Sequence, residues 1–109
     1  MNIKLKFTNL ESTVAIETYA DTKFGMLKKV LSHLDPDDMA DLHLELAHTT
    51  MHHQKGNVYA VKANLHIPGK IFQISEEADN LYSAIDIAKD TLYRSVEKYM
   101  EMKKDEKGK

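Results

Sequence analysis

Histidine is the residue type in this chain that most readily suggests chemistry, because imidazole binds zinc, copper and nickel. Six histidines are present, and His48, His52 and His53 fall within one short stretch. A structural zinc site needs about four ligands at defined spacing, and thiolate ligands are excluded because the chain has no cysteine. Three histidines at the edge of an expected loop (residues 49–57) fix no such geometry. We therefore expect solvated histidines and no metal site.

Clustered carboxylates are the second candidate, since paired acids can perform general acid–base catalysis. The acids of segment 35–38 lie in a predicted turn, where such side chains usually accept hydrogen bonds from the backbone. The acids of segment 76–79 precede a predicted helix, where negative charge interacts favourably with the helix dipole. No nucleophile elbow, phosphate loop or dinucleotide fingerprint is present. These patterns predict a protein that is not an enzyme, with no cofactor and no small-molecule substrate.

Basic residues give the more useful pattern, because they gather on the two predicted helices. The candidate RNA-binding residues are Lys23, Lys28, Lys29, Arg94, Lys98, Lys103 and Lys104. Arg94 and Lys98 are four residues apart and are expected to share one flank of their helix. Lysine and arginine neutralise phosphates, and arginine can also stack on a base. The alternative is that these charges are the ordinary solvated faces of two helices, interrupted by acids.

Tyr82 and Tyr93 flank the apolar stripe of the last predicted helix. Tyrosine rings can stack on bases of single-stranded RNA. They can equally cover the edge of a hydrophobic core, which is the more common arrangement.

The bulk composition indicates one folded domain. A chain of 109 residues can bury a sizeable core, and we expect a single domain over residues 1–104 followed by a polar tail at 105–109. The absence of cysteine and of a long apolar run favours a cytoplasmic protein that does not bind membranes. The net charge is −2, but segment 35–54 carries five acids and no lysine or arginine. The rest of the chain can therefore present a basic face.

Hydrophobic periodicity predicts the order β-α-β-β-β-α. Apolar residues alternate with polar ones in segments 2–8, 40–48, 58–67 and 70–75, which indicates strands with one buried face. Steps of three and four indicate a helix over residues 13–34, capped by Ser12 or Thr13, and a second helix beginning near Asp79 or Asn80. Pro68-Gly69 predicts a tight hairpin turn.

The economical packing is an α+β fold in which a four-stranded sheet carries both helices on one face. The other face of the sheet is then exposed to solvent. The residues expected to be buried are Ile3, Leu5, Leu27, Leu31, Leu44, Val61, Leu65, Phe72, Ile85 and Leu92.

Several of these segments resemble one bacterial family, the ribosome hibernation-promoting factors or ribosome-associated translation inhibitors, also called the sigma-54 modulation protein family. The likeness is strongest in Asp79-Asn80-Leu81-Tyr82-Ser83-Ala84-Ile85-Asp86, and in Leu92-Tyr93-Arg94-Ser95-Val96 followed by Lys98. Lys23-Phe24-Gly25-Met26-Leu27 is similar to the family's first helix. Two departures are Met26 and Thr91, where family members often carry a basic residue.

The resemblance implies a fold akin to double-stranded RNA-binding domains with an added first strand. It also implies binding to ribosomal RNA of the small ribosomal subunit, occupation of the mRNA and tRNA channel, inhibition of translation and preservation of idle ribosomes under stress. Because the sequence ends after the last helix, it resembles the short form of the family. The alternative is a protein-interaction module of the same fold that does not act on the ribosome and binds a protein partner through the exposed sheet face or the acidic segment 35–45.

Overall fold

The computed structural model describes residues 1–49, 56 and 58–107, with the side chains of residues 105–107 left aside. Its elements in chain order are β1 (Asn2–Thr8), α1 (Val14–Gly25), α2 (Leu27–Leu31), β2 (Asp41–Thr49), β3 (Val58–Ile67), β4 (Lys70–Ala78) and α3 (Leu81–Lys107). Within the described ranges, no helix is long and apolar enough to cross a membrane.

The four strands form one sheet in the order β1-β2-β3-β4. β1 runs parallel to β2, so the connection between them must cross the sheet, and α1 and α2 make that crossover. The other neighbours are antiparallel. The predicted Pro68-Gly69 turn joins β3 to β4 with Ile67 opposite Lys70, and Gly69 has a φ of 81°, a conformation that glycine adopts without strain.

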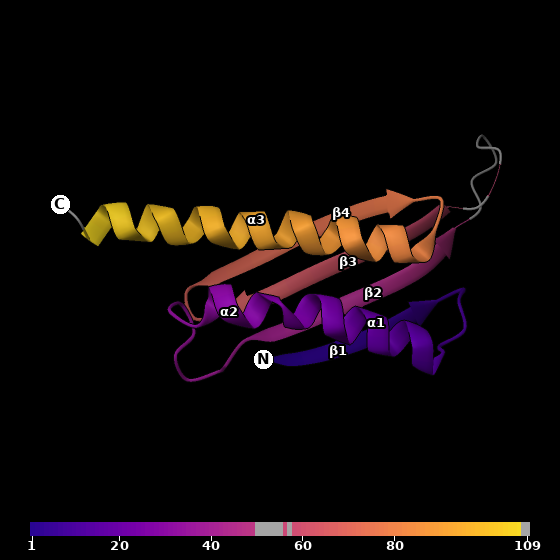
Figure 1. Cartoon of the computed structure of the whole chain (residues 1–109), viewed down its shortest axis with the longest axis horizontal. Coiled ribbons are helices and arrows are strands. Elements are labelled where there is room, and N and C mark those ends of the chain that lie inside the picture. The colour runs from indigo at the N-terminus through magenta and orange to yellow at the C-terminus, as the bar shows by residue number, and fades with distance from the viewer. Residues whose placement is uncertain (50–55, 57, 108–109) are drawn as a thin grey trace.

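Both helical segments lie on the same face of the sheet, with α3 in front of β3 and β4 and the α1–α2 segment beside it (Figure 1). Alternation along the strands accounts for this arrangement. Leu42, Leu44 and Leu46 of β2 are buried under the helices, whereas His43 is exposed on the open face. The predicted α+β fold is therefore confirmed.

The core contains eight of the ten residues expected to be buried. Phe24, Leu27, Ile85 and Leu92 from the helices are fully enclosed between helices and sheet. Ile3 and Leu5 are only half-buried, so the prediction of full burial was wrong for them. The reason is that β1 is an edge strand, with a neighbour on one side only.

The predicted single helix over residues 13–34 is divided. Thr13 caps α1 as expected, its Oγ1 accepting from the Ile16 N–H at 3.2 Å. The first helix ends at Gly25, where the Met26 N–H donates to the Lys23 carbonyl (3.2 Å), three residues back. Such a bond tightens the last turn and breaks the α-helical register. α2 then ends at Leu31, three residues before the predicted end at residue 34.

Asp35 organises the return from α2 to β2. Its carboxylate is buried and accepts from the N–H groups of Met39 and Ala40, each at 2.7 Å. This confirms the expected backbone role of at least one acid in the turn.

The second acidic segment is placed differently from the prediction. β4 continues to Ala78, so Glu76 and Glu77 belong to a strand and lie several residues before the first turn of α3, which begins at Leu81. Asn80 caps α3, its Oδ1 accepting from Tyr82 N–H (2.8 Å) and Ser83 N–H (3.3 Å). α3 continues through Lys107, into the segment predicted as a polar tail.

Candidate functional site

A groove of about 890 Å³ lies between the α1–α2 segment and α3. Residues from both sides of the break between α1 and α2 form one wall of the groove. Its lining consists of Thr22, Gly25, Met26, Lys29, Lys89, Asp90, Tyr93 and Arg94. The groove carries three cationic side chains against one carboxylate.

The cationic side chains of the groove differ in how far a neighbouring carboxylate neutralises their charge. Lys89 is only 18% exposed, and its Nζ lies 2.6 Å from Asp90 Oδ1. This hydrogen bond lowers the pKa of Asp90, and the charges of Lys89, Arg94 and Lys23 lower it further. Arg94 is exposed, and its Nε donates to the Asp90 carbonyl at 3.3 Å. Lys29 is exposed, and none of the described ion pairs includes it.

A polar contact joins α1 to α3 at one end of the groove. The Tyr19 hydroxyl donates to Asp86 Oδ1 at 2.6 Å, and Lys23 Nζ lies 3.5 Å from the same oxygen. The Tyr19 ring packs edge-on against Tyr82, with centroids 4.8 Å apart. The hydrogen bond to Asp86 raises the pKa of the Tyr19 hydroxyl, with burial and the charge of Asp86 acting in the same direction.

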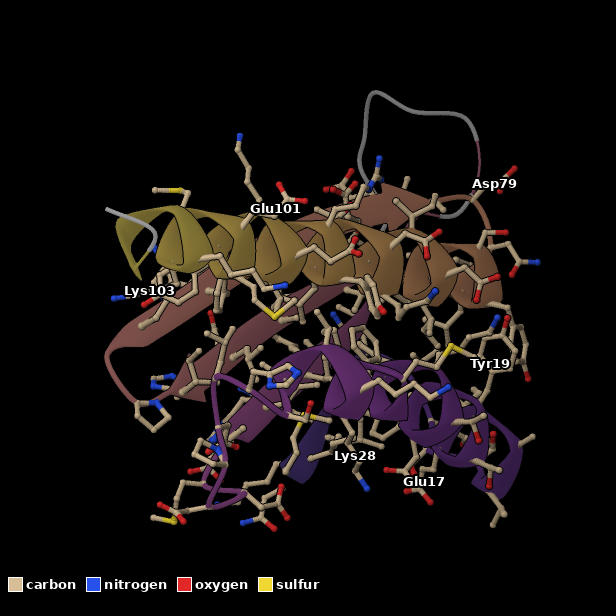
Figure 2. All side chains as sticks on the ribbon, turned by 60° about the vertical axis from the view of Figure 1, so that its left-hand side comes forward. Glu17, Tyr19, Lys28, Asp79, Glu101 and Lys103 are labelled. Atoms are coloured by element: carbon tan, nitrogen blue, oxygen red, sulfur yellow. The ribbon has the colours of Figure 1, made fainter. Side chains whose placement is uncertain are left out.

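The structure brings only part of the predicted basic set together. Lys29 and Arg94 face each other across the groove, and Lys23 lies at its end beside Asp86. Lys28 points away from α3 (Figure 2) and lines a separate hollow with Asp38.

Arg94 and Lys98 lie only about 40° apart around α3, as their spacing of four residues predicts. They nevertheless border different hollows, because Arg94 lines the groove whereas Lys98 lines a hollow beside β4 with Lys70. Lys103 lies near the free end of α3 (Figure 2), its Nζ 5.6 Å from the centre of the Tyr99 ring, and Lys104 is exposed.

The sequence prediction omitted Lys89, which the structure places in the groove. The available signal was its spacing of four residues from Tyr93, which also lines the groove. Of the two family departures, Met26 lies in the groove and is 46% exposed. Thr91 instead lies on the β4 side, where its hydroxyl donates to Glu76 Oε1 at 3.2 Å. The loss of a cation at Met26 therefore affects this surface, and the one at Thr91 does not.

The remaining sequence candidates are distributed over the surface. His43 and His66 are neighbours on the open sheet face, with ring centroids 6.1 Å apart, and His48 lies beside Tyr59. His52 and His53 fall outside the described residues. Among the described side chains, no group of three or more His, Asp or Glu residues could hold a metal ion. Tyr93 is half-buried against the core, as expected for a residue covering its edge, while Tyr82 is 41% exposed.

Solved structures with the same fold include a Protein Y domain and a ribosomal subunit interface protein. The N-terminal domain of Thermus thermophilus Protein Y superposes with a TM-score of 0.72 at 27% identity, over 91% of this chain and 99% of that one. A ribosomal subunit interface protein from Coxiella burnetii gives a TM-score of 0.71 at 19% identity, over 92% of this chain and 98% of that one, which shows a common fold.

Sequence comparison leads to the same group. A ribosome hibernation promotion factor from Picosynechococcus is 28% identical over 106 residues, which are 93% of this chain. The chain spans about half the length of that relative. The model of the family described as "Sigma 54 modulation protein / S30EA ribosomal protein" matches residues 3–104, and the chain therefore belongs to this family.

Proposed function

We propose that the chain is a non-enzymatic ribosome-binding factor that contacts ribosomal RNA of the small subunit. It occupies the channel for mRNA and tRNA, inhibits translation and preserves idle ribosomes under stress. Its place of action is the cytoplasm, where the ribosomes are. Family membership supports the ribosome as the partner, and the name of the Picosynechococcus relative supports hibernation as the setting.

The observation that carries the proposal is the groove between the helices. Lys29 and Arg94 stand on its two sides with their charged groups exposed. A phosphate that binds between them would be neutralised from both walls, and the planar guanidinium of Arg94 can donate two parallel hydrogen bonds to it. Tyr93 adds an aromatic surface on the floor of the same groove, which suits a ribose or a base edge.

The chemistry required is positioning alone. A folded domain that fills the channel excludes mRNA and tRNA by its volume, so no acid, base, nucleophile or cofactor takes part. Neutralised phosphates release their counterions, which supplies the favourable free energy of binding. The overall charge of −2 adds no long-range attraction, so binding depends on the local charge of this groove.

A protein-interaction role away from the ribosome remains the second candidate, because part of the positive charge in the groove is compensated within the chain. Lys89 pairs with Asp90, and Lys23 with Asp86. In this case the partner would bind the groove or the open sheet face without phosphate contacts.

Co-sedimentation with purified small subunits over a series of salt concentrations separates the two functions. Log affinity should fall linearly with log salt, with a slope of roughly −0.7 to −0.9 for each phosphate neutralised. The double variant Lys29→Ala/Arg94→Ala should bind more weakly at every salt concentration and give a slope shallower by about one to two. It should also lose inhibition in a cell-free translation assay.

The matched control is Lys4→Ala/Lys6→Ala, which removes two exposed lysines from β1 on the open face of the sheet. It should bind nearly as the parent does. A Lys98→Ala variant tests the residue that borders the hollow beside β4, and it should reduce the binding affinity less than Arg94→Ala. Equal sedimentation of the groove variant and the parent at all salt concentrations would refute RNA contact through the groove.

A further inference from the structure

β4 is an open edge of the sheet. The sheet ends at β4 on one side and at β1 on the other. In the two-residue hairpin, Ile67 and Lys70 exchange hydrogen bonds, so Lys70, Phe72, Ile74 and Glu76 direct their backbone groups toward β3. By alternation, Ile71, Gln73, Ser75 and Glu77 direct their N–H and C=O groups outward. Such a row of outward-facing backbone groups is a template for another strand.

Exposed apolar side chains accompany this edge. Ile71 is 53% exposed, and Met102 of α3, 56% exposed, lines the same shallow hollow beside β4. Ile87, one helical turn before Thr91, is 41% exposed. Thr91 contacts Glu76, and Tyr99 packs on Phe72, so α3 runs back along β4 in the opposite direction. Apolar surface therefore lies at both ends of this flank.

The charge pattern of β4 is complementary to itself. The strand Lys-Ile-Phe-Gln-Ile-Ser-Glu-Glu-Ala is positive at its beginning and negative near its end. Two copies that pair antiparallel about Gln73 bring Lys70 of each opposite Glu76 of the other, on the helix side of the sheet. Opposite charges on directly facing residues stabilise strand pairing. In the same register Met102 of one copy approaches the Ile87 region of the other.

The charge pattern of the other edge strand, β1, opposes pairing with a second copy. β1 carries Lys4 and Lys6 and no acid, so antiparallel pairing of two β1 strands would oppose lysine to lysine. Like charges directly opposite each other destabilise a pair of strands, and lysine is a common means of blocking an edge. Charge alone therefore distinguishes the two edges.

We propose that β4 is a homodimerisation edge, at which a second copy of this chain adds its β4 antiparallel and extends the sheet to eight strands. The two-fold axis passes beside Gln73, and both helical layers lie on the same side of the extended sheet. The groove between the helices stays accessible, because it lies on the α1 side of α3. The inference is independent of ribosome binding and concerns the free protein.

Charge reversal at the two ends of the strand tests the pairing, measured by sedimentation equilibrium of the purified protein over a wide concentration range. The parent should show a monomer–dimer equilibrium. Lys70→Glu and Glu76→Lys should each weaken it by roughly tenfold or more, since each change makes two symmetric pairs repulsive. The combined variant Lys70→Glu/Glu76→Lys should restore it. A parent that stays monomeric throughout, or single variants that dimerise as the parent does, would overturn the proposal.

A crosslinking experiment gives an independent readout if a charge variant folds poorly. The chain has no cysteine, and Gln73 is exposed. In the proposed dimer the two Gln73 Cα atoms would lie about 5.5 Å apart, within the range of a disulfide. Gln73→Cys should form a covalent dimer under mild oxidation, whereas the control Lys4→Cys on β1 should stay largely monomeric. Equal crosslinking of both variants would show random collision and contradict the assigned edge. Pairing with a peptide of another protein instead of a second copy would leave both variants monomeric.

Discussion

How available the charge of a residue on this surface is to a phosphate depends on the immediate neighbours of that residue. Arg94 and Lys98 are adjacent turns of one helix, yet one borders the groove and the other borders β4. Lys89 lies in the groove, but its charge is held by Asp90 at 2.6 Å. Lys29 and Arg94 are therefore the residues whose charge is most available to a phosphate.

Replacing Asp90 by asparagine should strengthen RNA binding. The change removes the single carboxylate that lines the groove and releases Lys89, so affinity for small subunits should rise severalfold and the salt slope should steepen by up to about one. Because the pKa of Asp90 is lowered, its carboxylate stays charged through neutral and mildly acidic pH. The difference in affinity for small subunits between variant and parent should therefore be constant over this pH range. The salt series of co-sedimentation measures both effects. Asp21→Asn, on the exposed side of α1, is the matched control, and equal binding of Asp90→Asn and parent would contradict the assigned role of the carboxylate.

At the scale of helices and strands, the break between α1 and α2 shapes one wall of the groove. Gly25 ends α1, and the tight bond from Met26 N–H to the Lys23 carbonyl redirects the chain into a short second helix. α2 then presents Lys28 and Lys29 to different hollows, Lys28 to the one beside Asp38 and Lys29 to the groove, because consecutive helical residues are about 100° apart.

Gly25→Ala should stabilise the protein. The backbone of Gly25 is helical, and a Cβ placed there meets no atom within 4 Å. The substitution lowers the conformational entropy of the unfolded chain and should add about 0.4–1 kcal/mol to the free energy of unfolding. Urea denaturation measures it. Gly69→Ala is the contrasting control, because a φ of 81° strains any residue with a Cβ, and this variant should lose stability. Destabilisation by Gly25→Ala would show that the break requires glycine.

The groove exists only because α1 and α3 dock side by side on one face of the sheet. Their apolar stripes bring them onto the same core, but the Tyr19–Asp86 hydrogen bond is a specific polar link between them. It joins residues 67 positions apart in the sequence. The width of the groove therefore depends on a contact between two residues that do not themselves line it.

Tyr19→Phe should loosen this docking and lower the melting temperature by a few degrees at neutral pH. The folded-state pKa of Tyr19 is raised, so its contribution to stability is complete below the unfolded value near 10 and is lost as pH rises through the folded value. The gap in melting temperature between parent and variant should thus narrow at strongly alkaline pH. Absorbance titration should also show a tyrosine with a raised pKa in the parent that is missing from Tyr19→Phe. Tyr82→Phe is the control, and a gap independent of pH would contradict the assigned hydrogen bond.

The local sequence pattern alone was sufficient to predict the order of elements and most of the core residues. Alternation in strands and steps of three and four in helices report which side of each element is apolar, and burial of that side leaves a sheet with one helical layer. Caps at Thr13 and Asn80 and the turn at Gly69 were also readable, because each depends on the chemistry of neighbouring residues. The family resemblance, confirmed by the comparisons, rested on the same local segments.

Contacts between distant segments decided the rest. The sequence could not indicate that Glu76 and Glu77 continue β4, because that extension depends on pairing with β3. Nor could it separate Arg94 from Lys98, since a helix has no groove side until another helix packs against it. The half-burial of Ile3 and Leu5, the pairing of Tyr19 with Asp86 and the openness of the β4 edge likewise follow from strand order and helix docking. Periodicity specifies which face of an element is apolar, whereas the neighbours of that element are set by how all the apolar faces are buried together.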